Sequence, residues 1–174
     1  MELIGYHGTS KYNGTLILKQ GFDITKCVIR DNNWLGKGIY FFADKRYANW
    51  WANIKSKGMV LSSHIRCRDN ELLDLDNHDD TVNFLRQCSE YQKRFNYNYK
   101  DVHQFANVFI DLYKTEFDIS VVMRTFPVDG GSFVKLYDVD KNIIRLTGMS
   151  LHQKQICVSR KECVFDVKEE RYAD

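Results

Sequence analysis

The sequence predicts an α+β domain, in which helical and strand-like segments occupy separate parts of the chain. Apolar residues recur every three or four positions between 81 and 117, which is typical of amphipathic helices. Short β-branched and aromatic runs occur before residue 76 and again after residue 118, and such runs are typical of strands. The chain has 174 residues, of which 44% are hydrophobic and 28% charged, so we predict a single globular domain over residues 1–174.

Charge and cysteine content narrow the class of protein. The net charge is +2, and no dense basic run marks a phosphate-binding face. The five cysteines form no Cys-x-x-Cys pair, and the N-terminus lacks the basic and apolar regions of a signal peptide. We therefore expect free thiols and a cytoplasmic protein. No apolar run approaches the ~20 residues that span a bilayer, and no histidine or acidic residues have metal-ligand spacing, so neither a membrane nor a metal is expected.

The N-terminal part of the chain predicts a strand, a helix and a loop. Residues 3–10 predict a strand that carries His7 and Gly8, and residues 11–20 predict a brief helix that ends at a glycine. Residues 23–35 are mostly polar and contain an Asn-Asn turn signal. We therefore predict a surface loop there, which could form one rim of a pocket.

The most distinctive stretch begins at Gly36 and reads Gly-Lys-Gly-Ile-Tyr-Phe-Phe-Ala-Asp. Its two glycines lead into a short aromatic strand, and the following residues 45–52 suit a helix that carries Tyr47, Trp50 and Trp51. Two interpretations stay open at this point. The rings hold a flat ligand, or they belong to an ordinary buried strand and helix.

The middle of the chain predicts strands followed by helices. Residues 59–67 and the apolar patch 72–75 are strand-like. His64, in the first of these segments, is expected to be a hydrogen-bonded structural residue. Two amphipathic helices follow, 81–95 and 99–117, after a capped N-terminus within 76–80.

The C-terminal part predicts a return to strands. Residues 119–124 are β-branched and strand-like, and the single proline, Pro127, is predicted in a turn with Gly130 and Gly131. Four further short strands are predicted, at 133–137, 143–146, 155–158 and 164–167.

Three segments resemble, in order, the three signature segments of the ADP-ribosyltransferases related to poly(ADP-ribose) polymerases. They are Tyr6-His7-Gly8-Thr9-Ser10, then Gly36-Lys37-Gly38-Ile39-Tyr40-Phe41 with Ala48-Asn49-Trp50, and then Gln155-Ile156-Cys157-Val158. The middle segment is the most specific of the three. The resemblance implies a split β-sheet core with peripheral helices and a helical insertion around 78–117. It covers nearly the whole chain except residues 81–117.

The resemblance also implies a function. It predicts a mono-ADP-ribosyltransferase that cleaves NAD, taken as substrate, and transfers ADP-ribose to a macromolecular acceptor, a nucleic acid or a protein. By analogy with small members of this family, the protein would act as a toxin held by an antitoxin protein, or as an effector of anti-phage defence.

Site residues follow from the same resemblance. His7 would donate a hydrogen bond to a hydroxyl of the adenosine-side ribose, and Gly8 would bind the nicotinamide carboxamide through its backbone. Tyr40 and Trp50 would stack on the nicotinamide, which is worth about 0.5–1.5 kcal/mol beyond burial. Tyr47 stands where related enzymes commonly carry a serine that holds the carboxamide. Two further residues of the matched segments, Thr9 and Gly38, complete the expected NAD-binding set.

The third segment departs from the common pattern, because Gln155 stands where a catalytic glutamate is usual. Glutamine can still donate and accept a hydrogen bond, but it supplies no negative charge and no general base. Losing such a preorganised charge commonly costs ~10²–10³ in rate, roughly 3–4 kcal/mol. With His7 and Tyr40, Gln155 forms the predicted catalytic set.

Three interpretations of Gln155 stay open. The chain is a working mono-ADP-ribosyltransferase with glutamine at this position; or it is an inactive module that binds NAD or a partner; or the alignment is shifted and Glu162 or another carboxylate serves instead. Gln153, two residues earlier, is predicted to recognise the acceptor, with a plain loop residue as the alternative. A phosphotransferase of the related fold, which removes a 2′-phosphate from RNA with NAD, is a less supported enzyme class.

Overall fold

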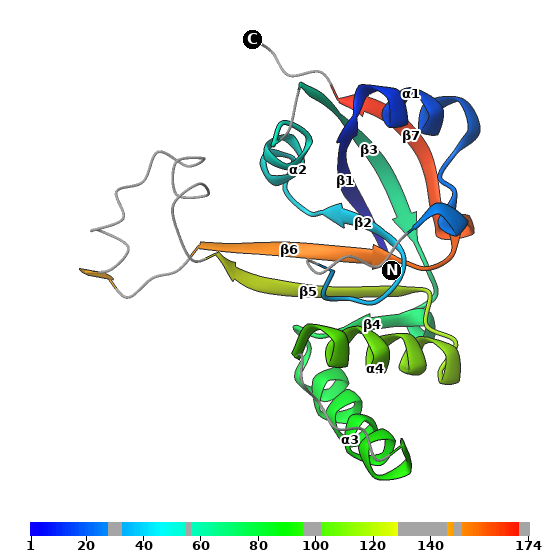
Figure 1. The fold of residues 1–174 in the computed structure, drawn as a ribbon, viewed down its shortest axis with the longest axis vertical. Helices are drawn as coiled ribbons and strands as arrows, with labels where there is room; N and C mark the ends of the chain where they lie inside the picture. The colour runs from blue at the N-terminus through cyan, green and yellow to red at the C-terminus, as the bar shows by residue number, and fades with distance from the viewer. Residues whose placement is uncertain (28–32, 55–56, 96–101, 129–145, 148–150, 171–174) are drawn as a thin grey trace.

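The computed structural model describes residues 1–27, 33–54, 57–95, 102–128, 146–147 and 151–170 (Figure 1). The helices are α1 (Lys11–Gln20), α2 (Lys45–Ala52), α3 (His78–Phe95) and α4 (Val102–Glu116). The strands are β1 (Glu2–Ser10), β2 (Ile39–Phe42), β3 (Gly58–Arg66), β4 (Leu72–Asp74), β5 (Val121–Val128), β6 (Leu151–Val158) and β7 (Val164–Glu170). Short 3₁₀ helices cover Ile24–Lys26 (η1), Asp69–Glu71 (η2) and Lys161–Cys163 (η4).

Within the described residues, the seven strands form one mixed sheet in the order β4-β5-β6-β2-β1-β3-β7. The pairing of β4 with β5 is parallel and the other pairings are antiparallel. Together with the separate helical segment of α3 and α4, this arrangement confirms the prediction of an α+β protein.

The sheet diverges between β1 and β2. These strands share one register pair, Tyr6 with Phe42, whereas β1 pairs with β3 along its whole length. Figure 1 shows β1, β3 and β7 turning away from β5 and β6 beyond this point. The sheet therefore consists of two parts that separate between β1 and β2.

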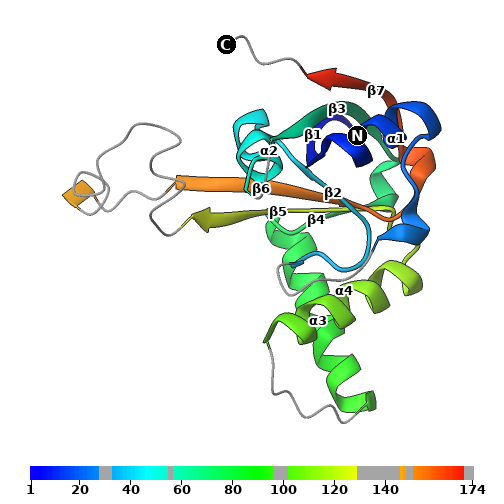
Figure 2. The ribbon, with the colours of Figure 1, turned by 45° about the horizontal axis from the view of Figure 1, so that its top comes forward.

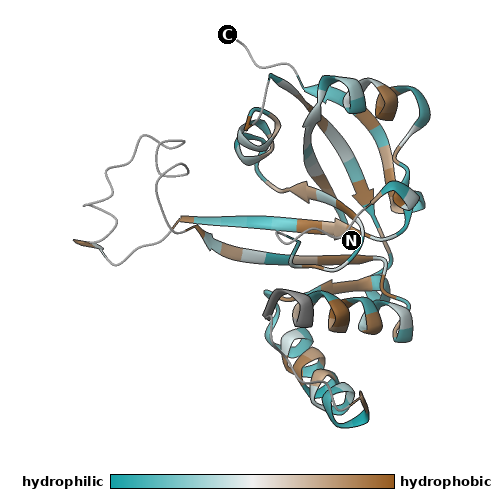
Figure 3. Cartoon of the chain, in the orientation of Figure 1, coloured by the Kyte–Doolittle hydropathy of each residue, from teal (hydrophilic) through white to brown (hydrophobic). Residues whose placement is uncertain are grey.

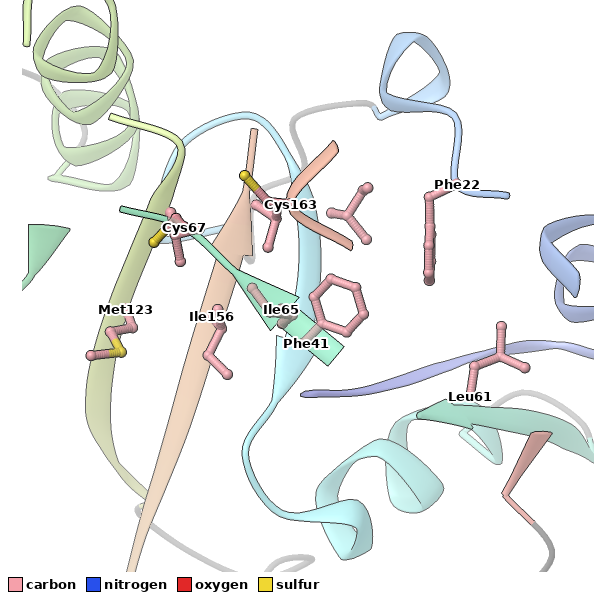
Figure 4. Close-up of a cluster of buried hydrophobic side chains, with 11 residues drawn as sticks. Phe22, Phe41, Leu61, Ile65, Cys67, Met123, Ile156 and Cys163 are labelled. Carbon is pink, nitrogen blue, oxygen red and sulfur yellow. The ribbon is translucent and has the colours of Figure 1, made fainter. Parts of the chain in front are cut away.

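One core lies on the α1 side of the sheet. Phe41 of β2 and Ile156 of β6 are each 1% exposed there, and Phe22, just after α1, packs with them (Figure 4). Helix α1 is capped by Ser10, whose hydroxyl accepts a hydrogen bond from the backbone of Asn13, and ends before Gly21 with φ 77°. The helix thus starts where β1 ends and covers this face.

A second core lies on the opposite face, where α3 and α4 pack (Figure 2). Val122 of β5 and Cys157 of β6 alternate with the residues of the first core and contact this cluster. Helix residues complete it, among them Tyr91, Phe109, Ile110 and Tyr113. Helix α2 shares this face, because its Ala48 and Ala52 pack on Tyr6 and Phe42. Tyr40 and Phe42 therefore lie on a face that α4 covers on one side and α2 on the other.

Two expectations about the C-terminal half are wrong, the turn at Pro127 and the alternative of a plain loop at Gln153. Pro127 lies within β5 and opposite His152, not in a turn. The physical reason is that β4 ends early: the N–H of Thr125 faces Asp76 and not a strand, and the nitrogen of Pro127, two residues on, faces the same unpaired side. Strand β6 begins at Leu151, so Gln153 lies in a strand and not in a loop.

The other element boundaries shift by a few residues. Helix α3 begins at His78, α4 ends at Glu116, and the predicted loop 23–35 contains η1. Leu146 lies in a helical turn, which contradicts the predicted strand 143–146 at that residue. The predicted strand 133–137 lies outside the described residues. None of the helices in the described part of the chain combines the length and apolar character that a membrane span requires.

Candidate functional site

His7 lies at the point where β1 and β2 separate. Its Nδ1 atom is 2.8 Å from the carbonyl oxygen of Tyr40. Since a carbonyl can only accept, the hydrogen of a neutral ring is on Nδ1, and Nε2 is left as an acceptor. Burial lowers the pKa of His7, against the opposing effect of its bond to Tyr40, and therefore favours this neutral form. A side chain thus links two strands where their backbone ladder stops.

The imidazole ring packs on the α1 side of the sheet. Its centroid is 5.2 Å from the Phe22 ring and 5.8 Å from the Phe41 ring, both with edge-to-face geometry. Side chains alternate along β2, so Phe41 points to the face opposite to Tyr40. His7 therefore approaches Tyr40 through its backbone oxygen and not through its ring.

Gly8 brings the backbone of α2 onto β1. A Cβ atom at this position would overlap the carbonyl oxygen of Ala48 and would lie 3.0 Å from the nitrogen of Ala52. Helix α2 is capped by Asp44, whose carboxylate accepts a hydrogen bond of 2.8 Å from the nitrogen of Arg46. Thr9, the next residue of β1, lies opposite Met59 of β3. The absence of a side chain at Gly8 therefore sets how closely the helix approaches.

The two aromatic residues of α2 differ in their surroundings. Tyr47 is 1% exposed, and its hydroxyl donates to the carbonyl oxygen of His152, 3.3 Å away. Its ring lies 6.1 Å from that of Phe42. Trp50 is half-buried, and its ring lies 6.1 Å from that of Trp51. Trp50 thus keeps partial exposure, whereas Tyr47 belongs to the core.

The hydroxyl of Tyr40 forms hydrogen bonds with residues 35 and 36, which precede β2. It donates to the carbonyl oxygen of Gly36 at 2.8 Å and accepts from the nitrogen of Leu35 at 2.9 Å. Burial raises the pKa of Tyr40, so its hydroxyl keeps its proton. Gly38 packs closely on β6, where a Cβ would lie 2.6 Å from the sulfur of Cys157.

Three polar residues of α4 bind the same segment. Asn107 accepts from the nitrogen of Gly36 at 2.9 Å and donates to the carbonyl oxygen of Asn33 at 2.8 Å. Asp111 accepts from the nitrogen of Lys37 at 2.8 and 3.2 Å.

The third of these residues is Lys114, which is 7% exposed. Its Nζ atom donates to the carbonyl oxygens of Leu35 at 2.7 Å and Lys37 at 3.0 Å, and it lies 3.3 Å from an Asp111 oxygen. Side chains therefore satisfy all six backbone polar groups of residues 35–37.

Gln155 lies on β6, directly opposite Phe42 of β2 and Arg124 of β5. Directly opposite residues of antiparallel strands point to the same face, so Gln155 shares the face of Phe42 and Tyr40. Glu162, the proposed substitute, lies in η4 beyond the end of β6 and outside this register. The register therefore places Gln155, and not Glu162, beside the aromatic strand.

Arg124 of β5 lies directly opposite Gln155 in the sheet register. Its guanidinium carbon is 5.2 Å from the centroid of the Phe126 ring, and that ring lies 6.0 Å from the ring of Trp34. Gln153 lies opposite Phe126, and its buried Oε1 atom has no hydrogen-bond partner among the described residues. Arg124 thus lies opposite Gln155, and two positions along β5 the Phe126 ring lies opposite the Gln153 amide and near the Trp34 ring.

The residues that sequence reasoning missed are those of α4 and Arg124. Asn107, Asp111 and Lys114 are spaced by four and three positions, which puts them on one helix face. In the sequence, that spacing lies within an apolar pattern that indicates packing alone. The sequence predicts a strand for Arg124, but no pattern connects Arg124 with Gln155.

Other candidate groups lie away from this face. His64 contacts Glu2 at 3.3 Å and Asp166 at 3.7 Å, which confirms that it is a hydrogen-bonded structural residue. All five cysteines are free, as predicted. In the described ranges, no three histidine, cysteine or acidic side chains gather as a metal site would require.

Comparisons with known proteins add no assignment. No protein-family model matches the chain, and no curated protein has a significant match to it.

Proposed function

We propose that the protein is a mono-ADP-ribosyltransferase, built on an ADP-ribosyltransferase-like split sheet, that cleaves NAD and transfers ADP-ribose to a nucleic acid or a protein. The observation that carries this proposal is the hydrogen bond between His7 and Tyr40 at the divergence of β1 and β2. The segments that resemble the family signatures are about 30 and 115 residues apart in the chain. Their residues His7, Tyr40 and Gln155 nevertheless lie on the three adjacent strands β1, β2 and β6, and Trp50 lies on α2.

The residues present suit the chemistry of NAD recognition. Trp50 offers a partly exposed ring for stacking, and Tyr40 lies on the same face of the sheet as Gln155. The neutral His7 has an acceptor nitrogen for a ribose hydroxyl, so in this proposal His7 accepts that bond instead of donating it. The Tyr47 hydroxyl already donates to the carbonyl oxygen of His152. In this proposal the backbone of Gly8 therefore binds the nicotinamide carboxamide.

NAD supplies the bond that breaks, between the ribose C1′ and the nicotinamide nitrogen, and nicotinamide leaves with the electron pair. The chain orients the two parts of the substrate around this bond. Gln155 would accept or donate a hydrogen bond at the ribose 2′-hydroxyl, without a charge to face the developing cation. Orientation of the substrate can still supply a large part of the rate enhancement. The acceptor nucleophile then bonds to C1′ and loses its proton.

A second candidate function is a module of the same fold that binds NAD or a partner without catalysis. Arg124 favours it, because a guanidinium opposite Gln155 opposes positive charge on the ribose. The two candidates differ in whether nicotinamide is released.

The experiment is incubation of the protein with radiolabelled NAD and a whole-cell lysate, followed by nuclease or protease digestion. The transferase proposal expects label in macromolecules, and loss of that label with His7→Ala. Digestion then tells which acceptor class carries it. Binding of NAD without nicotinamide release in any lysate would favour the second candidate. If the protein is a toxin, induction of the wild type should arrest growth, whereas His7→Ala should not.

A further inference from the structure

The segment 35–37 is held in an unusual way for a stretch outside regular secondary structure. Loop backbone groups commonly bond to water, but here each N–H and C=O of three consecutive residues bonds to a side chain. Helix α4 supplies Asn107, Asp111 and Lys114, and β2 supplies Tyr40. We call the three α4 residues the α4 brace.

Close approach is built into this contact. Gly36 has φ 74°, a conformation that favours glycine. A Cβ on Gly36 would overlap an Asp111 carboxylate oxygen and would lie 2.8 Å from the Lys114 nitrogen. The α4 brace can therefore approach the backbone this closely only because residue 36 has no side chain.

Packing of α4 does not require the brace. Phe109 and Ile110, at 1% and 2% exposure, already anchor the helix in the second core. Burying the Lys114 ammonium has a desolvation cost, and apolar residues at such positions often stabilise a fold as well or better. If Lys114 serves to hold residues 35–37 in place, this explains why its ammonium group is buried among three oxygen atoms.

We propose that Asn107, Asp111 and Lys114 are positioning residues of the NAD site, which act by fixing residues 35–37 and, through them, the ring of Tyr40. This inference rests on the proposed function. It gives a role to α4, which lies in the part of the chain that shows no resemblance to the transferase signatures.

The connection to Tyr40 is direct. Its hydroxyl bonds Leu35 and Gly36, the same residues that the α4 brace holds through Lys114 and Asn107. Loss of the brace leaves these partners free to move, so the Tyr40 ring samples several orientations. If only a fraction of the molecules holds the ring correctly, the apparent association constant for NAD equals the intrinsic constant multiplied by that fraction.

The test uses the full chain and the variants Asn107→Ala, Asp111→Ala and Lys114→Met. Amide hydrogen exchange, followed by NMR, measures how firmly the α4 brace holds the N–H groups of residues 35–37 in the absence of any ligand. We expect faster exchange at Gly36 in Asn107→Ala and at Lys37 in Asp111→Ala. Titration calorimetry measures the affinity for NAD, which depends on how Tyr40 is positioned. Lys114→Met should bind NAD about tenfold more weakly than the wild type. In turnover, KM should rise more than kcat falls.

Two further variants separate positioning from folding. Asp111→Asn keeps an acceptor oxygen for Lys37 and should retain more NAD affinity than Asp111→Ala. Tyr91→Phe removes the 2.6 Å hydrogen bond from α3 to Glu116 of α4, so it perturbs the helix pair away from the brace and should leave NAD binding unchanged.

The outcomes are distinct. Wild-type affinity for NAD in all brace variants would overturn the positioning role, even if Gly36 and Lys37 exchange faster. Unchanged exchange in the variants would overturn the brace itself. If the wild type does not bind NAD, the proposed function fails, and the role of the brace in it fails as well, while the exchange data still report whether α4 holds residues 35–37.

Discussion

The Nδ1 atom of His7 donates to the backbone oxygen of Tyr40 where the ladder between β1 and β2 ends. In a continuous antiparallel ladder, the pair Tyr6 and Phe42 would be followed by His7 with Phe41 and then by Gly8 with Tyr40. A half-buried histidine side chain occupies that opening and packs against two phenylalanine rings. The bond fixes the tautomer of His7 as well as the separation of the strands.

We expect His7 to make stability depend on pH. Burial lowers its pKa below the ordinary 6.5, so as the pH falls below 6.5 the unfolded chain takes up a proton that the folded chain excludes. Stability should therefore fall with pH in that window, by up to about 1.4 kcal/mol per pH unit. Urea unfolding of the wild type and His7→Gln at pH 7.5 and 5.5 checks this. The stability advantage of the wild type should shrink at pH 5.5, and a constant difference would contradict the prediction.

Gln155→Glu should raise the rate of NAD cleavage. A carboxylate opposite Phe42 would face the developing positive charge, and such charges are commonly worth ~10²–10³ in rate. Because Arg124 would draw part of that charge, we expect a gain of about tenfold. Nicotinamide release measures it, with Glu162→Gln as the matched control that should not change the rate. A slower Gln155→Glu variant would argue against the assigned role of Gln155.

Gly8→Ala should destabilise the fold and displace α2. The added methyl group overlaps the carbonyl oxygen of Ala48, and overpacking of this kind costs about 1–3 kcal/mol. Gly21→Ala is the control, because no atom lies within 4 Å of its Cβ position, and only its φ of 77° opposes the substitution. Thermal unfolding should show a larger loss for Gly8→Ala. NAD affinity should also fall for Gly8→Ala and be retained in Gly21→Ala.

Tyr47→Phe should leave NAD binding nearly unchanged. The hydroxyl bonds His152 and the residue is 1% exposed, so its removal costs one hydrogen bond, about 0.5–1.5 kcal/mol of stability. Tyr47→Ala, in contrast, creates a cavity and should cost about 3–5 kcal/mol. Calorimetry with NAD checks the first expectation. A large loss of affinity in Tyr47→Phe would instead assign the hydroxyl to the carboxamide.

Hydrophobic periodicity predicted most helices and strands because it reports which face of an element is buried. It located α1, α2 and β3, and it separated the α3 and α4 region from the strands. It failed for the outer part of β6, where Gln153 and its neighbours are polar and the predicted strand begins only at residue 155. Figure 3 shows the reason: β6 is hydrophilic where it extends past the core, although its backbone pairs with β5 throughout.

The candidate site was predictable only in part. Three signature segments gave His7, Tyr40 and Gln155, because specific residue types recur in order along the chain. The α4 brace was not predicted, since a polar residue on an amphipathic helix shows which face it occupies but not which distant backbone atom it binds. The contact between Asp111 and Lys37 spans 74 positions, and no local pattern encodes it.

The bonding of residues 35–37 has a consequence for proteolysis. Lys37 carries an exposed side chain, which trypsin recognises, but its N–H is bound by Asp111 and its carbonyl by Lys114. A protease must draw several residues into an extended strand in its own active site, and these residues cannot leave α4 and Tyr40 without breaking the six hydrogen bonds that hold them. Although it lies on the surface and outside any helix or strand, the peptide bond after Lys37 should be among the last that trypsin cuts in the folded protein.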